Sequence, residues 1–165
     1  KNAGVDFVIM PCVTAHYFMP EVFAQIDVPF LSLIDEAVDW AKENISGLKK
    51  VGLLSSTGTQ VSKLFQNKFE KAGIKVLAPE EKDQQKVMSA IFGAGGIKAG
   101  FTSGPSKESI IRAAEKLIAG GAEAIIAGCT ELPLVLKASD IPIPLIEPMD
   151  ILAKKSIVEA GYKVR

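Results

Sequence analysis

Short apolar runs rich in β-branched residues recur along the chain and alternate with longer amphipathic stretches. A continuous apolar run is typical of a parallel strand that is covered on both faces of its sheet. On this pattern we predict strands at 5–10, 51–54, 74–77 and 124–127, and shorter ones at 29–33 and 144–146.

Between these runs, apolar residues recur at the spacing of one helix face. The stretch 61–69 predicts one helix, which Gly73 ends, and the stretch 110–118 predicts another, which Gly120 and Gly121 end. Glycine is common after a helix because it adopts the left-handed conformation without strain. Strands that alternate with helices predict an α/β fold with mostly parallel sheets and flanking helices.

Two segments of the chain resemble two others in the same order, which indicates an internal repeat. Residues 5–16 and 122–133 each combine an acidic residue, an apolar strand, a cysteine and a nearby threonine. Residues 28–42 and 143–155 form the second similar pair. A duplication of this kind predicts two pseudo-symmetric lobes with a cleft between them. Ligands of open α/β sheets bind at the carboxyl ends of the strands, so we expect the site there.

The repeat divides the chain into two predicted lobes. We assign residues 1–46 and 143–165 to lobe 1 and residues 48–142 to lobe 2, with the helix after Met149 packed against lobe 1. The chain starts at Lys1 and reaches its first strand within a few residues. We therefore expect lobe 1 to lack its N-terminal part. A single continuous sheet would contradict this division.

Composition narrows the classes of function. The 165 residues contain 19 Lys and Arg against 19 Asp and Glu, a balance that gives no electrostatic attraction to nucleic acid or to an anionic membrane. No apolar run is long enough to span a bilayer, and no secretory leader pattern is present. We therefore expect a cytoplasmic protein that binds a small molecule. In that compartment its two cysteines remain thiols.

Cys12 and Cys129 are the candidate catalytic residues. Cysteine is commonly a buried and inert core residue, but these two occupy equivalent places in the repeat, each after a predicted strand. Each also precedes a loop-to-helix turn whose N–H groups favour a thiolate. No metal site is predicted, since two thiols and one histidine do not form a closed ligand set. We expect the two sulfurs to face each other across the cleft, farther apart than in a disulfide bond.

Five stretches of the sequence resemble the aspartate/glutamate racemase family, and within it the aspartate-type enzymes. They are M-P-C-V-T-A-H (10–16), K-V-G-L-L-S-S-T-G-T (50–59), I-K-A-G (97–100), A-G-C-T-E-L-P (127–133) and P-L-I-E-P-M-D-I-L-A (144–153). The resemblance covers essentially the whole chain. Glu131 stands where glutamate racemases carry His, which favours the aspartate type.

The resemblance implies a racemase that needs no cofactor, pyridoxal phosphate included. It implies that one thiolate of the Cys12–Cys129 pair removes the Cα proton of an acidic amino acid, with aspartate as the first candidate. The other thiol protonates the opposite face. General acid/base groups act best with a pKa near the working pH, and the pKa of a thiol is readily lowered toward it. The resemblance also implies a homodimer.

The same resemblance implies which residues bind the substrate. The I-K-A-G stretch supplies Lys98 for the side-chain carboxylate, although a lysine beside a Gly-rich turn is also commonly just solvated. Without a cofactor, hydrogen bonds to the α-carboxylate must stabilise the developing carbanion, and Thr14, Thr59 and Thr130 are the candidates. Glu131 is a further candidate substrate-binding residue.

Three more features bear on the predicted site. His16, the only histidine, either raises the thiolate population of Cys12 from behind it or caps a helix. Residues 55–58 either hold an anion on backbone N–H groups or form a plain N-cap. Val13 stands where the family usually carries Asn, which changes substrate preference or rate. An N-terminal arginine that the family uses for the distal carboxylate is absent from these residues.

Two alternative classes of function stay open. One is a related enzyme of the same superfamily: a hydantoin racemase, a maleate isomerase or a decarboxylase. The presence of Lys98 argues against a pocket for an uncharged side chain, because such a pocket would not need a lysine. The other is a racemase-like binding module or fragment that does not turn over. Deuterium exchange at Cα of aspartate separates a catalyst from a binder.

Overall fold

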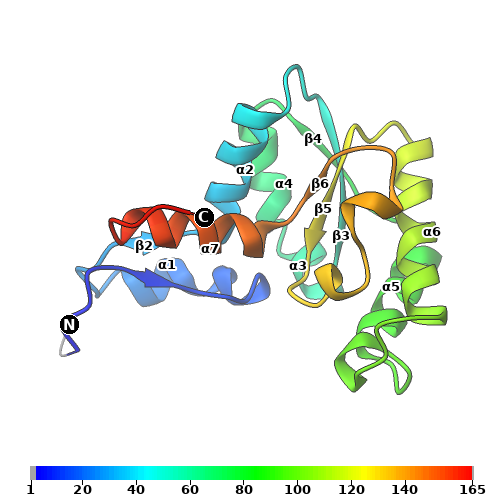
Figure 1. Cartoon of the computed structure of the whole chain (residues 1–165), viewed down its shortest axis with the longest axis horizontal. Coiled ribbons are helices and arrows are strands. Elements are labelled where there is room, and N and C mark those ends of the chain that lie inside the picture. Colours follow the sequence, from blue (N-terminus) through cyan, green and yellow to red (C-terminus); the bar gives the residue numbers. More distant parts are fainter. Residues whose placement is uncertain (1–2, 165) are drawn as a thin grey trace.

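The computed structural model describes residues 3–164 and contains two parallel sheets (Figure 1). The smaller sheet pairs β1 (Val8–Ile9) with β2 (Phe30–Leu31). The larger sheet has the strand order β4-β3-β5-β6, and each of its pairs is parallel. Its strands are β3 (Lys50–Ser55), β4 (Lys75–Leu77), β5 (Ala124–Gly128) and β6 (Leu145–Ile146).

Helices connect these strands and flank the larger sheet, so the predicted α/β fold with parallel sheets and flanking helices is confirmed. The α-helices are α1 (Met19–Phe23), α2 (Leu33–Asn44), α3 (Thr57–Val61), α4 (Leu64–Lys71), α5 (Glu81–Phe92), α6 (Pro105–Ala119) and α7 (Pro148–Glu159). The short 3₁₀ helices are η1 (Thr14–Tyr17), η2 (Ile97–Ala99), η3 (Leu132–Leu134) and η4 (Ala138–Asp140).

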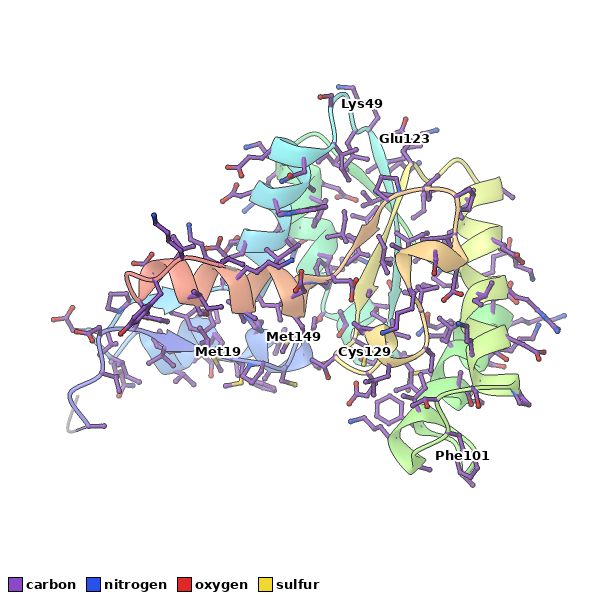
Figure 2. All side chains as sticks on the ribbon, viewed as in Figure 1. Met19, Lys49, Phe101, Glu123, Cys129 and Met149 are labelled. Atoms are coloured by element: carbon purple, nitrogen blue, oxygen red, sulfur yellow. The ribbon has the colours of Figure 1, made fainter. Side chains whose placement is uncertain are left out.

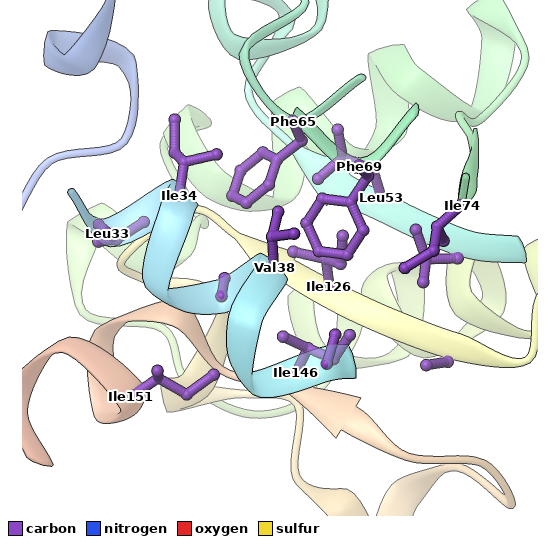
Figure 3. Close-up of a cluster of buried hydrophobic side chains, with 14 of the residues drawn as sticks. Leu33, Ile34, Val38, Leu53, Phe65, Phe69, Ile74, Ile126, Ile146 and Ile151 are labelled. Atoms are coloured by element: carbon purple, nitrogen blue, oxygen red, sulfur yellow. The ribbon is translucent and has the colours of Figure 1, made fainter. Parts of the chain in front are cut away.

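One face of the larger sheet packs against α2 and α4. Alternate residues of a strand point to opposite faces, and Leu53 of β3 and Ile126 of β5 point to this one. Figure 3 shows Phe65 and Phe69 of α4 in the same cluster, beside Val38 of α2. All five side chains are buried, and both phenylalanines are fully buried.

The other face of the sheet packs against α5 and α6. Leu54 of β3 and Ile125 of β5 point to it and meet Ile91 of α5 and Ile110 of α6. Both faces are thus covered by helices, which explains why β3 and β5 are continuous apolar runs and not alternating ones. Helix α5 lies outside the predictions, because its first two turns are mainly charged and polar.

The predicted lobe boundary is wrong at β6. Residues 143–165 were expected in lobe 1, but Leu145 and Ile146 pair with Ile125 and Ile126 of β5 in the larger sheet. The open edge of β5 offers these two apolar residues backbone partners and a buried place, which decides where they go. The rest of the division into lobes stays a prediction.

Helices α2 and α7 link the two sheets. Each packs against the other, and buried residues of both join the cluster on the first face of the larger sheet, including Ile34 of α2 and Ile151 and Leu152 of α7. Ser32 accepts a hydrogen bond from the Asp35 N–H (3.3 Å) and caps the N-terminus of α2 directly after β2. The smaller sheet is therefore anchored to the larger one through α2.

Candidate active site

The site lies at the carboxyl edge of the larger sheet, where its two central strands end side by side. Ser55 is the last residue of β3 and Gly128 the last of β5, and the two are paired across the sheet. Ser56 and Cys129 follow them directly. A parallel α/β sheet binds ligands at this edge, so the strand pairing delivers Cys129 to the place where a substrate is expected.

Gly128 sets how closely β5 approaches β3 just before the cysteine. A Cβ at position 128 would lie 2.5 Å from Leu53 Cδ1 and 3.0 Å from the Leu54 carbonyl oxygen. Only glycine fits without a shift of these neighbours. Gly128 is therefore a packing requirement that fixes the position of the Cys129 thiol.

Cys129 belongs to a hydrogen-bond network centred on Glu131. The Cys129 thiol donates to Glu131 Oε2 (2.9 Å), and the Thr130 hydroxyl donates to the same oxygen (3.0 Å). Lys98 of η2 pairs with the other oxygen, Oε1, at 2.5 Å. Lys98 also lies 5.4 Å from the centre of the Phe92 ring. Figure 2 labels Cys129 at this edge of the sheet.

The environment sets the protonation of this network. Burial, followed by the hydrogen bond to Glu131, raises the pKa of Cys129 to about 12. Burial alone would raise the pKa of Glu131, but the hydrogen bonds from Cys129, Lys98 and Thr130 outweigh it and lower that pKa to about 2. Glu131 in turn raises the pKa of Lys98. At neutral pH the network therefore contains a neutral thiol, a carboxylate and an ammonium group. The thiolate predicted for the turn after β5 is not the resting state of Cys129.

A cluster of three hydroxyl groups joins the Cys12 segment to the end of β3. The Thr14 hydroxyl lies 2.9 Å from that of Thr59 and 3.3 Å from that of Ser56. Ser56 also accepts a hydrogen bond from the Thr59 N–H (3.4 Å) as the N-cap of α3. This favours the N-cap interpretation of residues 55–58. Thr14 is partly exposed at this edge, whereas Thr59 is buried beneath it.

Cys12 is an exposed, free thiol on the loop between β1 and η1. The Thr14 contacts hold this loop against α3, beside the end of β3. The pKa of Lys98 is raised mainly by Glu131 and, to a smaller extent, by the negative charges that Cys129 and Cys12 can carry. Both thiols therefore lie within electrostatic range of one ammonium group. That their sulfurs face each other stays a prediction.

His16 holds the backbone of Cys12 and not its thiol. Its Nε2 accepts a hydrogen bond from the Leu33 N–H (3.2 Å), so Nδ1 carries the proton and donates to the Cys12 carbonyl oxygen (2.9 Å). Burial lowers the pKa of His16, which keeps the ring neutral. A neutral ring with both nitrogens occupied does not stabilise a thiolate by charge. The structure thus supports the capping interpretation: His16 ties Cys12 to the start of α2.

Val13 points away from the site. Its side chain is 4% exposed and belongs to the apolar cluster that α2 and α4 form on the larger sheet. The apolar residue at this position therefore adds to the core.

Gln84 of α5 is a residue at this edge that the sequence did not indicate. Its side-chain amide donates to the Ser55 carbonyl oxygen (2.9 Å), at the end of β3. No motif surrounds it, and α5 itself was not predicted, so only the packing of α5 on the sheet reveals this contact.

The fold and the site define an α/β protein with two free thiols. One thiol follows a central strand of the parallel sheet, and the other is on a loop held beside the carboxyl edge of that sheet. Comparison with known families gives the class a name. The model of the Asp/Glu/Hydantoin racemase family matches residues 1–156, and the chain belongs to this family. The resemblance drawn from the sequence motifs is confirmed.

Individual relatives agree with this assignment. The chain is 26% identical over 159 residues to the broad specificity amino-acid racemase RacX of Bacillus subtilis, covering 95% of this chain and 66% of that protein. It is similar to the solved structure of Picrophilus torridus aspartate racemase (TM-score 0.79, 28% identity, 100% of this chain and 66% of that one). It is also similar to an aspartate racemase homologue from Pyrococcus horikoshii (TM-score 0.81, 28% identity, 97% and 69%). The chain thus spans about two thirds of the length of these relatives.

Within residues 3–164, no helix is long and apolar enough to cross a membrane. In the same part of the chain, no three His, Cys, Asp or Glu side chains are grouped as metal ligands would be.

Proposed function

We propose that this protein racemises an acidic amino acid, aspartate first of all, without a cofactor and with Cys12 and Cys129 as the two acid/base groups. The observation that carries the proposal is that the segments of both free thiols meet at the carboxyl edge of the sheet: Cys129 directly follows β5, and Thr14, two residues after Cys12, contacts Thr59 beside the end of β3. Membership of the racemase family supports the reaction class. A cytoplasmic homodimer completes the proposal.

The proposed step transfers two protons on opposite faces of the substrate. A Cys12 thiolate takes the proton from Cα, and the electron pair of the broken C–H bond stays on the substrate as a carbanion. The Cys129 thiol then gives its proton to the other face of Cα and becomes a thiolate. The opposite reaction runs the same transfers backward. Two opposed groups are needed because a single base mostly returns the proton to the face it left.

Hydrogen bonds to the α-carboxylate stabilise the carbanion in this proposal, since no cofactor delocalises its charge. The hydroxyl groups of Thr14 and Thr59 are candidates because their cluster lies at the end of β3. Thr130 is a third candidate beside Cys129, although its hydroxyl proton is directed to Glu131. Lys98 is the candidate partner for the side-chain carboxylate of aspartate.

A wider substrate range is the second candidate function. Lys98 is already paired with Glu131 at 2.5 Å, so the ammonium group that an acidic side chain needs is largely neutralised. A substrate with a neutral side chain does not have to compete for it. The relative named as a broad specificity amino-acid racemase supports this alternative.

Proton exchange at Cα tests the proposal and separates the two candidates. The full-length protein is incubated in D₂O with L-aspartate or L-alanine, and NMR follows loss of the Cα proton while chiral chromatography follows the enantiomer ratio. We expect deuterium incorporation and racemisation with aspartate. Preference for alanine would select the wider range. Absence of exchange with both amino acids, in a folded protein, would reject racemisation of either kind.

A further inference from the structure

Both carboxylate oxygens of Glu131 are engaged by neighbouring side chains. Its Oε2 already accepts hydrogen bonds from Cys129 and Thr130, and its Oε1 pairs with Lys98. The carboxylate also carries the same charge as the carboxylates of an amino acid. In the resting site these contacts direct one oxygen of Glu131 to the Cys129 thiol, which makes this thiol a group on which Glu131 acts.

The geometry makes the two ionisation states of Cys129 unequal. The thiol donates to a carboxylate oxygen 2.9 Å away. Loss of that proton would leave two negative charges at this separation in a half-buried site, and repulsion between them is costly. Two charged groups influence Cys129: Glu131, which favours the thiol, and Lys98, which favours the thiolate. Lys98 is engaged by Glu131, so the thiol prevails.

We propose that Glu131 is a positioning residue that holds Cys129 as the proton donor of the resting site. This inference rests on the proposed two-thiol function. Three contacts carry it: Cys129 to Oε2, Thr130 to Oε2 and Lys98 to Oε1. Thr130 and Lys98 fix the carboxylate so that one oxygen faces the sulfur. The two thiols, although equivalent in the repeat, therefore differ in that the Cys129 thiol donates to a carboxylate.

The reactivity of the Cys129 thiol tests this inference without any turnover. The chain contains only two cysteines, so Cys12→Ala leaves Cys129 as the single thiol. Iodoacetamide alkylates the thiolate, and its rate against pH reports the thiolate fraction. In Cys12→Ala we expect slow alkylation that still rises above about pH 10. Adding Glu131→Gln should accelerate alkylation at about pH 8 by at least about 10-fold, the factor for a pKa lowered by one unit.

Asp140→Asn is the matched control. Asp140 forms a comparable half-buried ion pair with Lys107 (3.0 Å; side chains 17% and 34% exposed, against 18% and 46% for Glu131 and Lys98). The Asp140→Asn substitution should leave the alkylation rate of Cys129 unchanged. Circular dichroism and thermal melting establish that each variant is folded at the assay temperature.

Each outcome of the alkylation experiment either supports or overturns the inference. Alkylation of Cys129 in Glu131→Gln that is unchanged or slower overturns the inference, and so does acceleration of equal size in Asp140→Asn. If Glu131→Gln does not fold, Glu131→Ala takes its place: loss of the carboxylate must accelerate alkylation of Cys129 at about pH 8, and an unchanged or slower rate overturns the inference. Failure of the proposed function would be seen separately, as absence of Cα exchange in the wild-type protein.

Discussion

The segments that carry Cys12 and Cys129 are similar in sequence but differ in surroundings. Cys129 directly follows a fully buried strand and donates to a carboxylate, whereas Cys12 is an exposed thiol on a loop after a two-residue strand. The difference is visible two positions after each cysteine, where one copy has Glu131 and the other Thr14. Glu131 turns back to its own cysteine, while Thr14 reaches across to Thr59. Similar sequences thus carry one thiol that donates to a carboxylate and one for which the structure shows no carboxylate partner within the described residues.

Loss of either thiol should have the largest effect. Replacing Cys12 or Cys129 by Ser should lower racemisation in both directions by about 10²–10⁴-fold, the usual contribution of a general acid or base. Chiral chromatography of aspartate measures the rate. Thermal melting serves as the control, because Cys129 is half-buried and a folding defect would also reduce activity. Full racemisation by either variant would show that only one of the two segments is needed.

Lys98 should affect the KM of acidic substrates more than the KM of substrates with a neutral side chain. Lys98→Gln removes a charge-assisted hydrogen bond, about 1.5–3 kcal/mol, so KM for aspartate should rise about 10- to 100-fold. The KM of an amino acid with a neutral side chain should change little. Lys107→Gln, which removes the partner of Asp140, is the control and should leave both values unchanged. An equal rise in KM for both substrates would mean that Lys98 acts on Glu131 and the Cys129 segment and does not bind the substrate.

Position 128, directly before Cys129, should not tolerate a residue larger than glycine. Gly128→Ala places a Cβ 2.5 Å from Leu53 Cδ1, and overpacking of this kind costs about 1–3 kcal/mol of unfolding free energy. Urea denaturation measures the loss. Gly95→Ala is the matched change, because a Cβ there has open space and the stability should stay near that of the wild type. Equal stability of the two variants would mean that β5 can move away from β3 at no cost.

Because the Cys129 thiol is held protonated in the fold, alkaline pH should lower the stability of the protein by a small amount. The pKa of Cys129 is about 12 in the folded protein against an ordinary 9.0, so the fold binds this proton more tightly than the unfolded chain does. The resulting stabilisation is complete below pH 9.0 and fades as the pH rises toward 12. From about pH 8 to about pH 10.5, the melting temperature of the wild type should fall more than that of Cys129→Ala. Parallel curves would contradict a raised pKa.

The fold could largely be predicted from the sequence, because covered parallel strands leave a direct mark. The apolar runs at 51–54 and 124–127 became β3 and β5, and the family motifs agree with the family match. The prediction failed at β6, since a two-residue apolar strand fits either lobe and only the open edge of β5 decides its place. Helix α5 was missed because its packing face is short.

The chemistry of the site could be predicted only in part. Motif resemblance identified Cys129, Lys98 and Glu131 as residues of interest, but the Lys98–Glu131 pair joins two motifs that lie far apart along the chain. The protonation of Cys129 depends on burial and on where one carboxylate oxygen points, and neither is a property of sequence spacing. His16 shows the same limit: its neighbours in sequence indicated a role for the thiol, and the fold directs it to backbone groups of Cys12 and Leu33.

Hydrogen exchange at Cα by the two single-cysteine variants tests the central claim most directly. Cys12→Ala and Cys129→Ala are each incubated in D₂O with L-aspartate and, separately, with D-aspartate, and NMR follows the Cα proton. Each variant keeps the base for one enantiomer only. The account predicts slow exchange of one enantiomer by one variant and of the other enantiomer by the second variant. Equal rates for both enantiomers in each folded variant would contradict the assignment of Cys12 and Cys129 to opposite faces of the substrate.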